Sequence, residues 1–159
     1  MRGRIYWKQY NMAFNDFIKD LVESEIGVNK LVELLQRKGA TEVELSNAKE
    51  YDVAYTSSLN QKITLEVKED FLYQKTGNVA IEYMQWDKPT GISSSTADYY
   101  VYKLSNDFFS IKRESLQAKI ESSVAANQTR KVVTYDKKKK IDLYLVPVAV
   151  FTSWCKQII

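Results

Sequence analysis

The hydrophobic period of the chain changes at Gly39, and this change sets the class of fold that the chain can adopt. From residue 14 to residue 38, apolar side chains recur at helical spacing, and Gly39 is a typical stop signal. Beyond it, short segments alternate between apolar and polar residues or are rich in β-forming residues. The pattern predicts one long amphipathic helix followed by strands, which is an α/β fold.

The later segments divide into several strands and one further helix. The expected strands are 41–45, 51–56, 62–68, 78–86, 108–112 and two strands around a basic turn within 130–151. Residues 97–105 fit either a strand or the start of a buried helix, and 113–125 fit a helix. No internal repeat or linker interrupts the 159 residues, so we expect one domain over residues 1–159.

The chain contains no histidine, which limits the chemistry open to it. This absence excludes histidine-based nuclease and hydrolase sites and most zinc sites. Any catalysis must rest on carboxylates, lysine, tyrosine or a hard metal ion. The net charge of +3 permits a nucleic-acid partner without requiring one.

The sequence also gives an expectation for where the protein works. No apolar run approaches the length needed to span a bilayer, and the N-terminal stretch lacks the apolar core of a signal peptide. The single cysteine, Cys155, cannot form an internal disulfide. We therefore expect a cytoplasmic protein without a membrane partner.

The stretch ITLEVK, residues 63–68, places Glu66 and Lys68 on one face of a strand and three apolar residues on the other. A pattern this short is more often a half-exposed strand with a surface ion pair. Asp52 lies fourteen positions upstream of Glu66, and two neighbouring strands would bring both carboxylates to one edge. Two such carboxylates hold a hard divalent cation such as Mg²⁺, and a lysine beside them offsets charge in the transition state.

The helix offers a third carboxylate. At about 100° per residue, Glu25 falls within the edge of the apolar band, whereas Glu23 falls roughly opposite it. An inward-facing carboxylate is costly unless it is paired or bound to a metal. We interpret Glu25 as part of the metal site; the alternative is that it reaches solvent or caps a neighbouring amide.

This order of residues resembles the motif of the PD-(D/E)XK nuclease superfamily. The matching residues are Glu25 in VESEIGV, Asp52 in EYDVAY, and Glu66 and Lys68 in LEVKED; Tyr51 stands where a proline is usual. The small size, the leading helix and the spacings are most similar to archaeal-type Holliday junction resolvases. The segment GNVAIEYMQWDKPTGISSSTADYYVY resembles one found in small phage-encoded nucleases of the superfamily. The resemblance covers roughly residues 14–151.

The resemblance implies a restriction-endonuclease-like fold, with a central mixed β-sheet flanked by α-helices, and Mg²⁺-dependent cleavage of DNA. Mn²⁺ is expected to substitute for Mg²⁺. Asp52 and Glu66 would be the main metal ligands, joined by the carbonyl of Val67 and by Glu25, directly or through water. Lys68 would be the catalytic lysine. Glu23 is the fallback for Glu25.

The resemblance also implies two further polar residues that could support the ligands. Asp70 lies just beyond Lys68, and Gln85 lies in the segment EYMQW. For these two, a surface aspartate and an exposed strand glutamine are equally good interpretations.

Two segments are candidates for holding DNA. A lysine run lies in the expected hairpin, and a hydroxyl-rich loop spans 87–96. A solvated turn and a flexible connector are the alternatives. The candidate DNA-binding residues are Lys88, Ser93, Ser94, Ser95, Thr96, Arg130, Lys131, Lys137, Lys138, Lys139 and Lys140.

The favoured function is resolution of Holliday junctions by paired phosphodiester cleavage, with branched or duplex DNA as the partner. Because two strands must be cut symmetrically, a homodimer is expected. Its apolar contact would come from ADYYVY or LYLVPVAVF, although both stretches fit a core equally well.

Three other functions remain open from the sequence. One is a phage-type endonuclease of the same fold that acts in recombination, repair or DNA degradation, in the host cytoplasm. Another is a catalytically silent DNA-binding module. The last is an interaction protein with an accidental motif, in which Glu25, Asp52 and Glu66 would lie far apart.

Overall fold

The first described element is a single long helix. The computed structural model describes residues 14–46 and 50–159, with side chains described from residue 25 onward. Helix α1 spans Phe14–Arg37, and the chain leaves it through Gly39, whose φ of 93° is the left-handed conformation that glycine favours. This confirms the helix expected over residues 14–38. None of the helices in the described ranges has the length and apolar character needed to cross a membrane.

Six strands form a mixed sheet in the order β1-β2-β3-β6-β7-β10. Their bounds are Thr41–Leu45 (β1), Val53–Thr56 (β2), Lys62–Glu69 (β3), Tyr99–Leu104 (β6), Asp107–Lys112 (β7) and Lys156–Ile158 (β10). Strands β1, β2 and β3 are antiparallel neighbours, whereas β3 and β6 are parallel. Strands β7 and β10 complete the sheet with antiparallel pairs. A mixed sheet with helices confirms the α/β class.

A second sheet has four strands in the order β5-β4-β9-β8, all antiparallel. Their bounds are Lys88–Pro89 (β5), Asn78–Gln85 (β4), Lys139–Pro147 (β9) and Arg130–Asp136 (β8). Strands β4 and β5 lie in the connection between β3 and β6, together with helix α2 (Tyr73–Thr76) and the 3-10 helix η2 (Gly91–Ser93). The strands expected from the sequence are therefore divided between two sheets instead of forming one central sheet.

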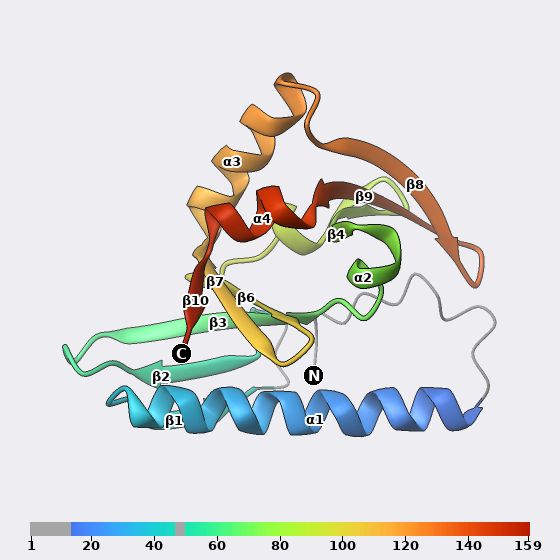
Figure 1. Cartoon of the computed structure of the whole chain (residues 1–159). Coiled ribbons are helices and arrows are strands. Elements are labelled where there is room, and N and C mark those ends of the chain that lie inside the picture. Colours follow the sequence, from blue (N-terminus) through green and yellow to red (C-terminus); the bar gives the residue numbers. More distant parts are fainter. Residues whose placement is uncertain (1–13, 47–49) are drawn as a thin grey trace.

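Helices cover the first sheet from both sides. Helix α1 lies along one face, and the second sheet lies on the other side with helices α3 (Arg113–Ala125) and α4 (Val148–Trp154) (Figure 1). The helix expected over residues 113–125 is confirmed, and residues 99–104 form a strand. Helix α4 and strand β10 were not expected from the sequence.

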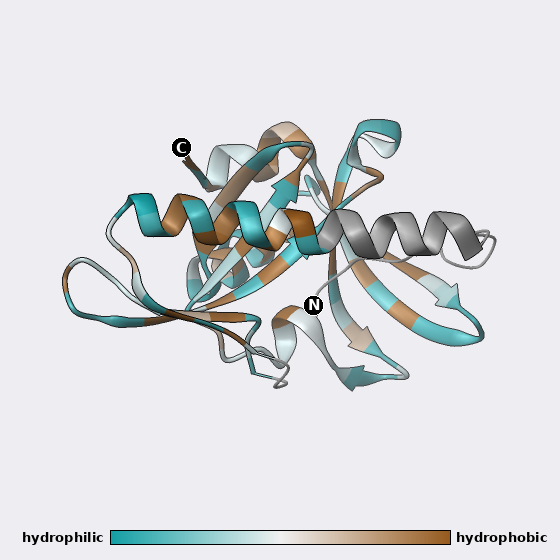
Figure 2. Ribbon diagram, turned by 90° about the horizontal axis from the view of Figure 1, so that it is seen from below, coloured by the Kyte–Doolittle hydropathy of each residue, from teal (hydrophilic) through white to brown (hydrophobic). Residues whose placement is uncertain are grey.

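Each side of the first sheet has its own hydrophobic core. Under α1, Leu31 and Leu35 pack with Leu65 and Val67 of β3, which confirms the apolar face expected for residues 63–67. The described part of α1 alternates between hydrophobic and hydrophilic residues accordingly (Figure 2). On the other side, the second sheet packs with α3, α4, and Tyr100 and Tyr102 of β6.

The two stretches expected to offer an apolar dimer contact are largely internal. In ADYYVY, Tyr100 and Tyr102 are buried; in LYLVPVAVF, Leu143, Val146 and Phe151 are buried. Of the two interpretations open from the sequence, the structure supports the core. A homodimer stays a prediction.

Candidate active site

Asp52 and Glu66 are neighbours because β2 pairs with β3. Val53 pairs with Leu65, so the residue before Val53 lies beside the residue after Leu65. Two hydrogen bonds hold this register: the Asp52 N–H donates to the Leu65 carbonyl at 2.9 Å, and the Val67 N–H donates to Asp52 Oδ2 at 2.8 Å. The expectation that two adjacent strands bring these carboxylates together is confirmed.

Both carboxylates are buried. Asp52 is 4% exposed and Glu66 is 7% exposed. Lys68 lies on the same face of β3, with its Nζ 3.3 Å from Glu66 Oε1. A buried carboxylate is costly unless it is paired, and Lys68 supplies the compensating charge. The alternative of an ordinary surface pair is therefore wrong for Glu66.

Two tyrosines of β6 complete this face of the sheet. In the parallel pairing of β3 with β6, Glu66 lies opposite Tyr100 and Lys68 lies opposite Tyr102. Burial raises the pKa of both tyrosines, and the charge of Glu66 raises it further. Both phenols therefore remain protonated next to Glu66. Sequence reasoning gave no tyrosine a role, although their alternation in a strand parallel to β3 predicts this position once the pairing is known.

Asp70 joins the two sheets. It is buried, and its carboxylate accepts hydrogen bonds from the Leu72 N–H at 2.9 Å and from the Ala80 N–H of β4 at 3.0 Å. Burial raises the Asp70 pKa, while these backbone donors oppose the shift. The alternative of a surface aspartate is wrong. Gln85 lies at the end of β4 in the second sheet, where it pairs with Lys88 and Ile141.

Glu25 does not point inward as the helical pattern predicted. It is exposed, because Gly27, Val28 and Leu31 form the buried face of α1 at this height. The side chain of Glu23 lies outside the residues described in atomic detail. Within the described ranges, no three Asp, Glu or Cys side chains converge closely enough to hold a metal ion. The candidate ligands are therefore the pair Asp52 and Glu66, and a role for Glu25 stays a prediction.

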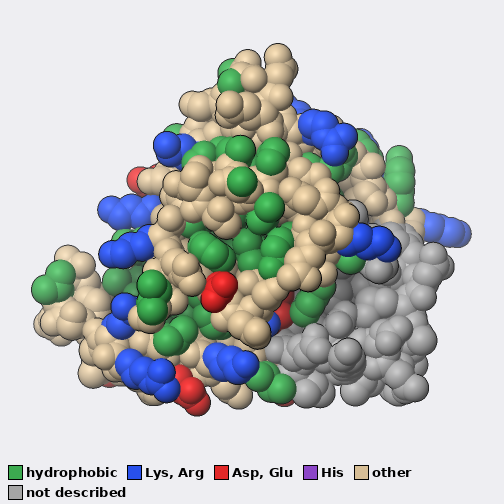
Figure 3. Space-filling view, viewed as in Figure 1, with side chains coloured by type: hydrophobic (Ala, Val, Ile, Leu, Met, Phe, Trp, Pro, Cys, Tyr) green, Lys and Arg blue, Asp and Glu red, His purple; other side chains and the backbone are tan. Residues whose placement is uncertain are grey.

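Most of the candidate DNA-binding residues are on the surface. The exposed ones are Lys88, Ser93, Ser94, Thr96, Arg130, Lys131, Lys137, Lys138 and Lys139. Basic side chains project where Figure 1 places the turn between β8 and β9 (Figure 3). Lys140 differs, because its Nζ lies 2.6 Å from Asp87 Oδ1. Ser95 is half-buried and lies close enough to Tyr100 to lower the pKa of that phenol, so this loop borders the candidate site.

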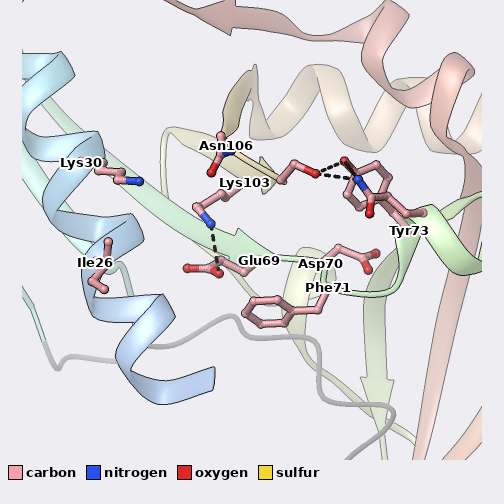
Figure 4. Close-up of a pocket in the computed structure, with 10 residues that line it drawn as sticks. Ile26, Lys30, Glu69, Asp70, Phe71, Tyr73, Lys103 and Asn106 are labelled. Atoms are coloured by element: carbon pink, nitrogen blue, oxygen red, sulfur yellow. Dashed lines mark hydrogen bonds and ion pairs between the residues drawn. The ribbon is translucent and has the colours of Figure 1, made fainter. Parts of the chain in front are cut away.

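A pocket of about 410 Å³ opens at the end of β3, on the side of α1 (Figure 4). Its charged lining residues are Lys30, Lys103, Glu69 and Asp70. The Lys103 Nζ lies 3.7 Å from Glu69 Oε2, as the dashed line in Figure 4 shows. Within the pocket, the charge of Lys103 is therefore offset by Glu69, whereas the Asp70 carboxylate is held by the backbone N–H groups of Leu72 and Ala80. Glu69 faces α1, whereas Glu66 faces the second sheet, so this pocket and the candidate site are on opposite faces of β3.

Comparison of the chain with known proteins found no similar protein. No family model matches the chain, and neither the curated proteins nor the solved structures contain a significant match. The chemistry must be judged from the site itself. Two adjacent buried carboxylates supply hard oxygen donors, and a lysine ammonium lies within reach of one of them. Such a set can bind Mg²⁺ and stabilise a developing negative charge.

Proposed function

We propose that this protein is a metal-dependent DNA endonuclease of the PD-(D/E)XK type, with a restriction-endonuclease-like core. One observation carries the proposal: Asp52 of the turn before β2 and Glu66 of β3 are buried side by side, with Lys68 paired to Glu66. The leading helix and the three antiparallel strands that follow it are consistent with the sequence resemblance. The second sheet is an addition to that core: β4 and β5 come from the connection between β3 and β6, and β8 and β9 come from the segment between α3 and α4.

The residues present fit a magnesium ion. Mg²⁺ is usually held by one or two carboxylates together with waters and substrate phosphates, and Asp52 and Glu66 provide that number. The Val67 N–H is bonded to the Asp52 carboxylate, so the backbone of Val67 lies next to a candidate ligand. The Val67 carbonyl, which the resemblance implies as a further ligand, belongs to this same backbone segment. When bound, the ion would polarise a phosphodiester and lower the pKa of a bound water.

Lys68 is the residue that would act on the reacting phosphate. Its ammonium offsets the charge of Glu66 in the resting protein and can offset charge on the phosphate in the transition state. In hydrolysis, water forms a new bond to phosphorus, the bond to the leaving oxygen breaks, and the proton lost by the water is balanced by protonation of that oxygen. The histidine-free chain leaves this proton transfer to water, carboxylates, lysine or tyrosine.

The preferred substrate is a four-way DNA junction cut by a homodimer; the alternative is other DNA in recombination, repair or degradation. The loop with Ser93, Ser94 and Thr96 is exposed beside the site face and can contact phosphates. A silent DNA-binding module is disfavoured because the carboxylates and the lysine are together. An accidental motif predicted three scattered carboxylates; Asp52 and Glu66 lie together, although Glu25 does not join them.

The test is cleavage of a labelled four-way junction compared with linear duplex, single-stranded and flapped DNA, in Mg²⁺ and in EDTA. Paired symmetric cuts in the junction alone, lost in EDTA, would support resolution. Mg²⁺-dependent cutting of every substrate would favour the alternative nuclease. Tight binding without any cutting would reject the nuclease and leave a DNA-binding module.

A further inference from the structure

Three large apolar side chains are exposed at one end of the second sheet. Trp86 is 54% exposed, Val133 is 51% exposed and Tyr135 is 56% exposed. Trp86 lies in the turn between β4 and β5, and the other two lie on β8. Strand β9 connects them: the Trp86 N–H donates to the Lys140 carbonyl at 2.9 Å, and Lys140 pairs with Tyr135. We call the two aromatic residues Trp86 and Tyr135, together with the neighbouring aliphatic Val133, the aromatic tip.

Exposed lysines surround the aromatic tip. Lys137, Lys138 and Lys139 lie at the turn between β8 and β9, and Lys88 follows the turn that holds Trp86. Lys131 shares the face of Val133 and Tyr135, because residues two apart in a strand point the same way.

Acidic groups near the tip do not balance these lysines. Asp87 is already paired with Lys140. The remaining carboxylates here, Asp136 and Asp142, are partly buried and buried, respectively, and they are fewer than the five exposed lysines. The tip is therefore cationic as well as apolar, and basic side chains project from this edge in Figure 3.

This combination points to one kind of partner. Exposed aromatic rings stack on bases whatever their identity, and nearby lysines contact the phosphates of the same strand. A second copy of the chain would bring the same lysines into contact with themselves, and like charges disfavour that pairing. A polyanion with accessible bases satisfies both the charge and the rings.

We propose that the aromatic tip binds unpaired bases of DNA. The proposal rests on the proposed nuclease function and narrows its substrate class to DNA with unstacked bases, as at a branch point, a flap or a single-stranded tail. Bases inside a continuous duplex are stacked on one another and offer no face to Trp86 or Tyr135. The lysines contribute to binding of both forms, whereas the rings distinguish between them.

The experiment measures binding by fluorescence anisotropy in EDTA, where cleavage does not occur. The probes are a continuous duplex and the same duplex with a single-stranded tail. The variants are Trp86→Ala, Tyr135→Ala and the double variant Lys138→Ala with Lys139→Ala. Leu59→Ala is the matched control, because Leu59 is a large exposed apolar residue away from the second sheet. Circular dichroism establishes that each variant is folded.

We expect each aromatic substitution to weaken binding of the tailed DNA about tenfold and to leave duplex binding unchanged. The lysine variant should weaken both and reduce the salt slope by about 2. An equal loss on both probes, or no loss on either, would overturn the proposal. So would a change in oligomeric state with unchanged DNA affinity. The assay needs no catalysis, so the two proposals can fail separately. If the aromatic variants lose binding of tailed DNA alone and the wild type never cuts DNA, the proposed role of the aromatic tip stands and the nuclease function is rejected.

Discussion

Asp52 combines a structural contact with a place in the candidate site. Its Oδ2 accepts a hydrogen bond from the Val67 N–H, and this bond holds the buried segment of β3 that carries Glu66. A change at Asp52 therefore affects folding as well as chemistry, and the two effects can be separated by the choice of substitution.

The first prediction concerns this separation. Asp52→Ala leaves the Val67 N–H without its acceptor and should lower the free energy of unfolding by about 1–3 kcal/mol. Asp52→Asn keeps an oxygen acceptor and should lower it less. Both should lose Mg²⁺-dependent cleavage. Urea denaturation of the two variants checks the prediction, and an asparagine variant as unstable as the alanine variant would contradict it.

Asp70 gives a prediction about pH. Because burial raises its pKa in the folded protein, Asp70 keeps its proton to a higher pH there than in the unfolded chain. Its contribution to stability is therefore complete below the ordinary carboxyl pKa and is lost as pH rises through the raised value. The free energy of unfolding of the wild type, minus that of Asp70→Asn, should therefore increase as pH falls from neutral toward the ordinary carboxyl pKa. Urea denaturation across this range tests it; a constant or shrinking difference would refute the sign.

Tyr102 gives a prediction of the opposite kind. Its side chain is fully buried, its ring packs against Phe151, and its hydroxyl has no hydrogen-bond partner in the described part of the chain. Tyr102→Phe removes a buried polar atom and keeps the ring, so the thermal unfolding temperature should stay the same or rise. A clear fall would show that the hydroxyl has a partner in the protein in solution.

At the residue scale, the sequence located Asp52, Glu66 and Lys68 because strand alternation and the order of the motif are local signals. The prediction that Glu25 faces inward was wrong. Glu25 lies at the edge of the apolar band of the helix, and the sequence does not show which edge of that band the sheet covers. The buried face of α1 follows Gly27 and Val28, and Glu25 is left in solvent.

At the scale of elements, the loop between β5 and β6 forms one border of the candidate site. Gly91 holds this loop against β4: its φ is 50°, and a Cβ there would overlap the Glu82 carbonyl. Ile92 then inserts into the core, and Ser95 reaches Tyr100. The position of the hydroxyl-rich segment thus depends on one close backbone approach.

Gly91→Ala should therefore lower the free energy of unfolding by about 1–3 kcal/mol, because the new methyl group requires the backbone to shift. Ser93→Ala, an exposed change in the same loop, should leave stability within about 0.5 kcal/mol of the wild type. Denaturant unfolding of both variants checks this. Equal stability of the two variants would show that the loop is not held at Gly91.

The type and position of the helices and strands were predicted better than the way in which the strands pair. The helices over 14–38 and 113–125 and most strands follow from periodicity, which is encoded within each segment. Sheet membership is not local: β4 joins the second sheet, and its Ala80 N–H is tied to Asp70 across the boundary. The short strand β10 is defined by its pairing with β7 and has little pattern of its own.

In the whole molecule, the proposed chemistry lies on the first sheet and the proposed selection of DNA lies on the second. The candidate site lies on β3 next to the parallel pairing with β6, and the aromatic tip lies at the end of β4, β8 and β9. The net charge of +3 is modest, so the proposed binding of DNA would depend on local clusters of lysine.

The central claim is that Glu66 is part of a hydrolytic metal site. The most direct measurement is the single-turnover rate of DNA cleavage as Mg²⁺ is varied, for the wild type, Glu66→Gln and the control Glu114→Gln, whose side chain is exposed on α3. We expect Mg²⁺-dependent cleavage by the wild type and the control, and a rate at least about a hundredfold lower for Glu66→Gln. Cleavage by Glu66→Gln at the wild-type rate, or no cleavage by the folded wild type at any Mg²⁺ concentration, would contradict it.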